Sequence, residues 1–231
     1  MRRAAALLLA SLAIVPAATA AGDFPLAETP LAGSDLLAYL ISCALPPSET
    51  AVVETGSGAR RLRGGLGLAP DWQRRSLTPA DAARVSACIL ARLNRSGAHV
   101  EVSLRAGPGF PDPPPALDAS AAERLAFPLH EGGFSGDLFG PGAPAYVCQG
   151  RAAVETPDLL RKARRLCALP SGATTVDGAP LSECGLIITG PCDGGEAPRD
   201  EIHVFLREPS SEPPSGARPE GRAPRLRSCP C

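Results

Sequence analysis

The chain has 231 residues, of which 44% are hydrophobic, and its 23 basic and 24 acidic side chains leave a formal net charge of −1. This composition excludes a polar disordered chain, and the missing basic surplus argues against a protein that binds nucleic acid through its phosphates. Aromatic residues make up only 4%, which argues against stacking platforms for bases or sugars.

The first 20 residues have the pattern of a secretory signal peptide. A basic start, Met1 to Arg3, precedes an uncharged run over residues 4–15, and Ala18-Thr19-Ala20 fits the small-x-small rule for cleavage. The apolar run is too short to span a bilayer core of roughly 30 Å, so a membrane anchor is the weaker interpretation. We expect cleavage after Ala20 and no transmembrane segment in the rest of the chain, which places the protein in the periplasm or outside the cell.

All eight cysteines follow this leader, and an even number in an exported chain indicates disulfides. Eight cysteines allow 105 pairings, which the sequence does not resolve. If a strand separates Cys184 from Cys192, these two cannot bond to each other, because an extended chain rises about 3.3 Å per residue. The pairs we favour are Cys43–Cys88, Cys148–Cys192 and Cys167–Cys184. The remaining two cysteines are Cys229 and Cys231.

Three helices are predicted. The first follows Ser34 or Asp35 as its N-cap, carries an apolar stripe over residues 36–44 and ends before two prolines. The second begins after Thr78, where Pro79 and Asp81 complete a capping box, and continues toward Gly97. The third begins with the same cap-and-proline signal at Thr156 and extends to Cys167.

Short strands are predicted at 51–55, 99–105, 145–148, 185–189 and 201–206. In two of them the alternation places His99 and His203 on the solvent-facing side, where histidines are usually solvated. With three helices and four to six strands at irregular spacing, we predict a compact α+β domain over residues 21–207, stabilised by disulfides. The Pro/Ser/Gly/Arg-rich tail over residues 208–231 should lack a packed core.

The glycine-rich segment 127–139 is the first place to look for chemistry. It brings a base, a hydroxyl and two carboxylates within eight residues, namely His130, Glu131, Ser135 and Asp137. A hydrolase would need His130 within hydrogen-bond reach of Ser135 or Glu131, and three groups from one local stretch rarely manage this. The alternative is a turn-rich segment whose Phe134, Leu138 and Phe139 pack into the core.

Metal and cofactor motifs are missing from the sequence. It contains no Cys-x-x-Cys pair, no His-Glu-x-x-His and no haem attachment motif, so we expect neither a metal nor a cofactor. The Cys229-Pro230-Cys231 terminus could handle thiols or soft metals. The alternative, that it ties the tail to the domain, is favoured because no helix N-terminus is predicted there to lower a thiol pKa.

Four segments resemble those of exported, cysteine-containing proteins from GC-rich bacteria for which no activity is known. They are residues 67–72, 85–92, 131–139 and 146–150. The resemblance implies export and paired cysteines but transfers no functional residue. Taken together, the sequence predicts a secreted or periplasmic binding or structural module without catalysis, acting on an envelope or extracellular component. A hydrolase built on His130 and a thiol protein built on Cys229 and Cys231 are the two alternatives.

Overall fold

The computed structural model describes residues 33–55, 58–97, 99–140, 142–193 and 200–209. The leader, the tail beyond residue 209, and with it Cys229 and Cys231, lie outside these residues. Within the described residues the helices are α1 (Gly33–Ala44), α2 (Pro79–Arg92), α3 (Ala121–Ala126), α4 (Arg151–Glu155) and α5 (Pro157–Lys162), with a 3-10 turn, η2, at Pro115–Leu117. The strands are β1 (Thr50–Thr55), β2 (Gly58–Arg63), β3 (Val102–Ala106), β4 (Leu129–Gly136), β5 (Ala145–Gln149), β6 (Pro170–Thr174), β7 (Pro180–Ser182), β8 (Ile187–Pro191) and β9 (Ile202–Leu206).

The fold is mixed α+β, as the sequence predicts, although five helices and nine strands are described where about three and four to six were expected. Strands β1 and β2 form an antiparallel hairpin, and the other seven form one sheet in the order β3-β9-β4-β5-β8-β7-β6. Only β5 and β8 pair in parallel among these strands. Apart from β4, whose glycines suggested turns, the strands and helices that the sequence did not predict have three to six residues each and are too short to show a period.

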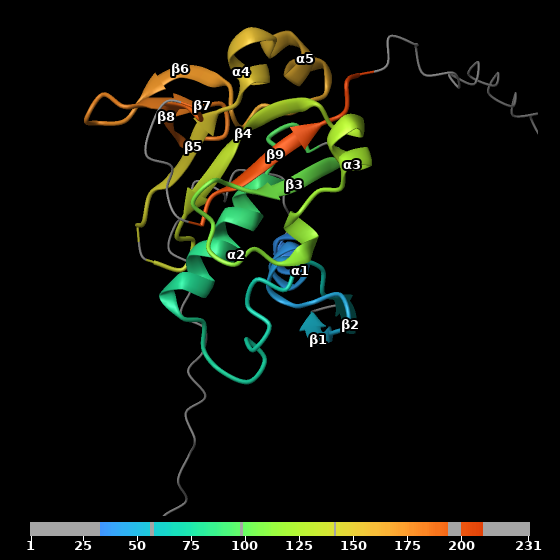
Figure 1. Cartoon of the computed structure of the whole chain (residues 1–231). Coiled ribbons are helices and arrows are strands. Elements are labelled where there is room, and N and C mark those ends of the chain that lie inside the picture. Colours follow the sequence, from blue (N-terminus) through green and yellow to red (C-terminus); the bar gives the residue numbers. More distant parts are fainter. Residues whose placement is uncertain (1–32, 56–57, 98, 141, 194–199, 210–231) are drawn as a thin grey trace, which may run out of the picture.

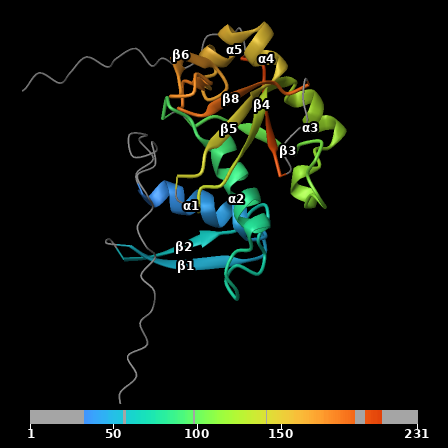
Figure 2. The ribbon, with the colours of Figure 1, turned by 90° about the vertical axis from the view of Figure 1, so that its left-hand side faces the viewer.

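Helix α2 lies across one face of the large sheet, against β4 and β9 (Figure 1). Helix α1 and the β1–β2 hairpin lie together at one end of the molecule, and α4 and α5 lie at the other end (Figure 2). The core between α2 and the sheet contains fully buried Val85, Phe134 and Ile202. One side of the sheet is therefore sealed by a helix, and β3 stands at a sheet edge.

The capping box of α2 is confirmed. Thr78 accepts a hydrogen bond from the Asp81 backbone N–H, and the Asp81 carboxylate accepts one from the Thr78 backbone N–H, while Pro79 occupies the first turn. The helix ends at Arg92, earlier than the glycine at 97 suggested. The predictions for the other two helices need correction: α1 already begins at Gly33, and Thr156 makes no side-chain capping bond to α5, which ends at Lys162.

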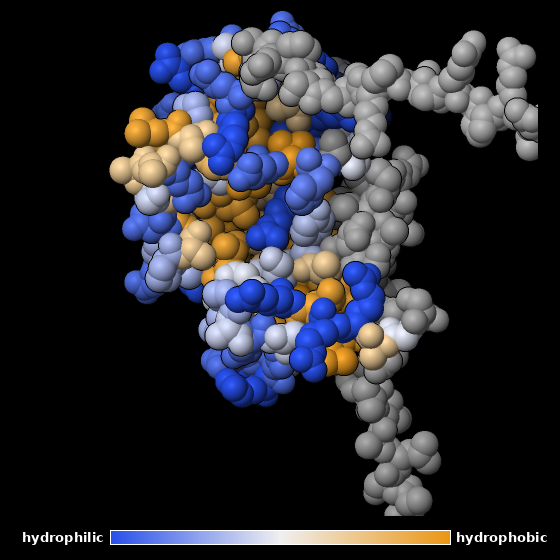
Figure 3. Space-filling view, turned by 90° about the vertical axis from the view of Figure 1, so that its right-hand side faces the viewer, coloured by the Kyte–Doolittle hydropathy of each residue, from blue (hydrophilic) through white to orange (hydrophobic). Residues whose placement is uncertain are grey.

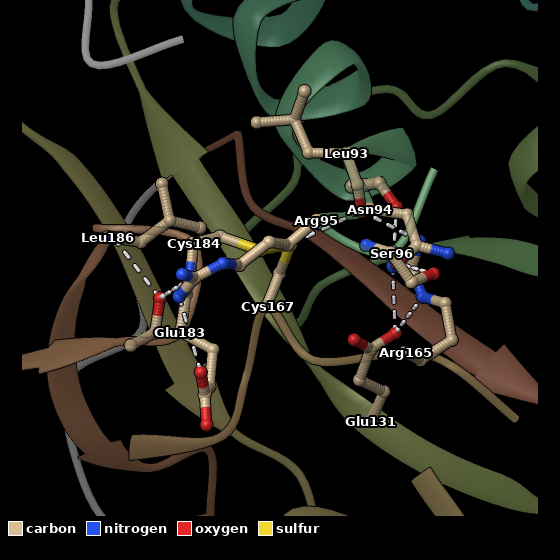
Figure 4. The surroundings of a disulfide bond; sticks show 12 residues. Leu93, Asn94, Arg95, Ser96, Glu131, Arg165, Cys167, Glu183, Cys184 and Leu186 are labelled. Atoms are coloured by element: carbon tan, nitrogen blue, oxygen red, sulfur yellow. Dashed lines mark hydrogen bonds and ion pairs between the residues drawn. A yellow bond between two sulfur atoms is a disulfide. The ribbon is translucent and has the colours of Figure 1, made fainter. Parts of the chain in front are cut away.

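The described part of the chain contains three disulfides: Cys43–Cys88, Cys148–Cys192 and Cys167–Cys184. These are the pairs that the sequence analysis favoured. The first ties α1 to α2, which explains why each cysteine falls in an apolar helical stripe. The third joins the segment after α5 to the turn before β8 (Figure 4). Three disulfides are compatible with an oxidising, extracellular or periplasmic environment. Among the described residues no helix has both the length and the apolar character to cross a membrane.

Candidate functional site

The glycine-rich segment forms β4, a central strand, and the expectation of a turn-rich segment is wrong. Strand β4 pairs with β9 on one side and β5 on the other. Its glycines fit because neighbouring groups fill the space that a side chain would need: a Cβ on Gly133 would lie 2.5 Å from Glu201 Cδ. Phe134 is fully buried as expected, but Phe139 is 45% exposed, because it lies beyond the end of the strand.

The four candidate residues of the glycine-rich segment do not assemble a catalytic group. His130 and Ser135 are five residues apart on an extended strand, which corresponds to about 16 Å. Glu131 is buried, and its Oε2 accepts a hydrogen bond from Arg165 Nε at 2.8 Å (Figure 4). Asp137, just after the strand, accepts at Oδ1 the backbone N–H groups of Phe139 and Gly140, at 2.9 and 3.2 Å, which is a turn-forming role.

His130 instead belongs to a stack of rings on the sheet face opposite α2. Its ring lies 4.8 Å from that of His203 and 4.5 Å from that of Phe205, nearly parallel to both. Arg105 places its guanidinium 3.7 Å from the centre of the Phe205 ring. The stack forms because His203 and Phe205, two residues apart on β9, point to the same face of the sheet, and His130 of the paired strand β4 contacts both rings there.

The expectation that His203 is solvated is wrong, because it is only 8% exposed. The reason is that β3 and β9 are covered on both faces, and Ser103 and Arg105 of β3 are buried as well. His99, which precedes β3, is exposed as predicted. The alternation of polar and apolar residues along a strand could not reveal that the second face is also covered, since the covering residues are far away in the chain.

Glu201 connects His203 to a disulfide. Its Oε2 lies 2.9 Å from His203 Nε2, and its Oε1 lies 3.2 Å from Cys148 Sγ. Cys148 is bonded to Cys192. Five side chains therefore meet at this point, namely those of His130, Cys148, Cys192, Glu201 and His203. A cavity of about 670 Å³ opens beside them, lined by His130, His203 and Asp193 together with the proline-rich segment after β3.

His130 is kept neutral in this environment. Burial lowers the pKa of its imidazole to about 4, and the neighbouring His203 and Arg105 act in the same direction. Its Nε2 is buried without a hydrogen-bond partner among the described residues. The ring therefore offers an unprotonated nitrogen or an N–H to whatever occupies the cavity, but it has no third group that would orient it as a general base.

A second hollow lies between the helices and the edge of the sheet, with a volume of about 630 Å³. Figure 3 shows a hollow on this side of the molecule in which apolar surface is bordered by hydrophilic side chains. It is lined by Tyr39 and Leu66 on the helix side, by Val100, Val102 and Leu104 at the sheet edge, and by Ala116 and Glu123 near α3. We call this hollow the edge groove.

Two guanidinium groups line the edge groove: that of Arg165 is paired with Glu131, and the other belongs to Arg92. Its Nη1 donates to Ser42 Oγ at 2.9 Å, and its guanidinium lies 5.9 Å from the ring centre of Tyr39. Burial lowers the pKa of the guanidinium, which reflects loss of hydration rather than loss of charge. Among the described residues no carboxylate lies within ion-pair distance of Arg92.

The fold and these two sites define a class: an α+β module cross-linked by disulfides, with one cavity lined by histidines and one groove of mixed polar and apolar lining at a sheet edge. Comparison of the chain with models of protein families, with curated proteins and with solved structures gave no match. The resemblance to exported proteins of GC-rich bacteria gains no support from these comparisons.

Proposed function

We propose that the protein is an exported, non-catalytic binding module and that the edge groove is its ligand site. Export rests on the leader pattern of residues 1–20 and on the three disulfides, which are compatible with an oxidising compartment. On this proposal the secreted or periplasmic domain spans residues 21–207, and its ligand comes from the envelope or the extracellular surroundings.

One observation supports the groove as a ligand site: a hollow with both apolar and polar lining contains a cation, Arg92, without a carboxylate partner in the described residues. A guanidinium that has lost hydration without gaining an anion is left with unsatisfied charge. An anionic ligand group would compensate it through charge-assisted hydrogen bonds. A volume of about 630 Å³ is within the usual range for small-molecule pockets.

The occupant that fits both features is a small amphipathic carboxylate, such as a medium-length aliphatic carboxylic acid. Its hydrocarbon chain would cover Val100, Val102 and Leu104 along the sheet edge, and its carboxylate would face Arg92. Glu101 and Glu123 also line the groove. Because these carboxylates would repel the anionic end, the ligand should place that end at Arg92 and its apolar end toward them.

The proposal is tested by titrating the purified protein with decanoate and with decanol in a calorimeter. Decanoate should bind more tightly than decanol, and Arg92→Gln should weaken decanoate binding by about 10- to 100-fold, the value of a hydrogen bond to a charged group. Decanol binding should change little in Arg92→Gln. Arg60→Gln, at an exposed position of β2, is the matched control and should bind decanoate like the parent chain.

The result that would overturn the proposal is equal binding of decanoate to the parent chain and to Arg92→Gln, or no binding to either. An extended peptide that adds a strand to β3 would be a different outcome, visible as protection of the β3 backbone amides from hydrogen exchange while Arg92→Gln remains without effect. Hydrolase activity abolished by His130→Gln would contradict the non-catalytic part of the proposal.

A further inference from the structure

The side chains around Cys148–Cys192 have the donor types and the spacing of a metal site. The potential ligand atoms of His130, Cys192 and His203 lie within 4.8 Å of one another, and so do those of Cys148, Glu201 and His203. His203 belongs to both groups, so a single centre connects them. No sequence motif reveals this cluster, since its members come from three strands and two connecting segments.

We propose that reduction of the Cys148–Cys192 disulfide creates a Zn²⁺ site whose four ligands are Cys148, Cys192, His130 and His203. Two thiolates and two imidazoles are a ligand set that Zn²⁺ takes in tetrahedral geometry. This site is separate from the edge groove and does not depend on the proposed carboxylate ligand.

The distances require only small movements. Bonds of about 2.0 Å to nitrogen and 2.3 Å to sulfur place tetrahedral ligand atoms roughly 3.3 to 3.8 Å from one another. Within each of the two groups the present spacing of up to 4.8 Å is wider by about 1 Å, a shift that small movements of the side chains can supply, and the disulfide brings Cys148 of the second group next to Cys192 of the first. The two sulfurs have to separate from bonding distance to about 3.8 Å, which reduction permits.

The hydrogen bonds leave the right atoms free. His203 Nε2 lies 2.9 Å from Glu201 Oε2, so its Nδ1 is the atom left for a metal. A carboxylate that holds the second nitrogen of a ligating histidine is the usual outer partner in zinc sites. His130 Nε2 is buried and has no hydrogen-bond partner in the described residues. A buried polar atom without a partner is unfavourable, and a metal ion would satisfy it.

Three glycines make room for the cluster. A Cβ on Gly133 would lie 2.8 Å from His203 Cδ2, and one on Gly150 would lie 2.7 Å from His130 Cγ. A Cβ on Gly107 would lie 3.2 Å from His203 Cδ2. Both histidines thus pack against bare backbone, which leaves room for small shifts of their rings, and the adjoining cavity leaves access for an ion.

The redox step balances with a dithiol as reductant. Two electrons and two protons pass from the dithiol to the Cys148–Cys192 bond, which gives two thiols and leaves the donor as a cyclic disulfide. Zn²⁺ then binds both sulfurs and releases two protons. Cys192 is the accessible sulfur of the pair, because it is half-buried and precedes the exposed Asp193, whereas Cys43 and Cys88 are fully buried.

The test uses the full chain carrying Cys229→Ser and Cys231→Ser, so that tail thiols cannot contribute. The protein is reduced with dithiothreitol, freed of reductant without air, and titrated with Co²⁺, which reports sulfur ligation and tetrahedral geometry by its absorption. We expect one Co²⁺ per chain with sulfur-to-metal charge-transfer bands, displaced by Zn²⁺, and no such bands in the oxidised protein.

Variants assign the ligands. His130→Ala and His203→Ala should each weaken Zn²⁺ binding at least 10-fold, and Glu201→Gln should weaken it about 10- to 100-fold, as expected for an outer partner. Replacing Cys167 and Cys184 by serine is the matched control and should leave the Co²⁺ spectrum unchanged, because that pair lies outside the cluster.

The proposal is wrong if the reduced chain gives no charge-transfer bands, or if both histidine variants bind like the parent. Should reduction unfold the chain, Zn²⁺ must restore its near-ultraviolet circular dichroism in the parent and not in a His130→Ala/His203→Ala double variant. Failure of that restoration would equally refute the site.

Discussion

The buried ion pair between Arg165 and Glu131 is the clearest place to test how this fold is held together. Both side chains are almost fully buried, with 2% and 0% exposure. Arg165 Nη1 and Nη2 also donate to the backbone oxygens of Leu93 and Ala91, at 2.8 and 3.0 Å. One guanidinium therefore joins the C-terminal end of α2 to the central strand β4.

Arg165→Met should destabilise the protein by roughly 5 kcal/mol. Leaving one member of a buried pair without its partner typically costs 3–5 kcal/mol. The two carbonyl groups that lose their donor add about 1 kcal/mol each, partly offset by water or by relaxation of the helix end. Arg161→Met is the matched control: its ion pair with Glu183 spans 3.6 Å and its own side chain is 51% exposed, so the loss should stay below about 1 kcal/mol.

The assay is urea unfolding followed by circular dichroism, at several pH values. Burial raises the pKa of Glu131 already in the parent chain, and loss of Arg165 raises it further. A carboxyl whose folded pKa lies above its unfolded value contributes most below the unfolded pKa, and that stability is lost as the pH rises. Arg165→Met should therefore recover part of its lost stability as the pH falls toward 4.

A double variant Arg165→Met/Glu131→Leu completes the test. It removes both charges, so its loss should be several kcal/mol smaller than the sum of the two single losses. Equal losses for Arg165→Met and Arg161→Met, or strict additivity in the double variant, would refute the view that desolvated charge dominates here.

Three further predictions follow from the described contacts. The pKa of His130, measured by proton NMR, should be about 4, which is below the unfolded value of 6.5. The free energy of unfolding should therefore decrease by up to about 3 kcal/mol as the pH falls from 6.5 to 4. The variant His130→Gln should lack this pH dependence. Thr78→Ala should cost about 1 kcal/mol in urea unfolding through loss of the capping box, and an unchanged midpoint would count against that cap. Replacing Cys43 and Cys88 by alanine opens a loop of 45 residues and should cost about 4 kcal/mol in the chain-entropy picture, so a loss below about 1 kcal/mol would contradict it.

Local signals in the sequence determined the features that depend on neighbouring residues. Thr78, Pro79 and Asp81 specify the start of α2 because a capping box needs only the first turn of a helix. The favoured disulfide pairs match those in the structure, since apolar helical stripes brought Cys43 and Cys88 to facing surfaces. The mixed α+β class followed from the same alternation of short periodic segments.

The tertiary structure alone decided where the chemistry-bearing residues meet. His203 was expected in solvent, because strand alternation assigns a face but cannot say whether another segment covers that face. The glycines of β4 suggested turns, because the local sequence does not show that Glu201 and His203 fill the space beside Gly133. Cys148, Cys192, His130 and His203 are brought together by strand pairing between β4, β5, β8 and β9, and such pairing joins residues tens of positions apart, which no local pattern in the sequence encodes.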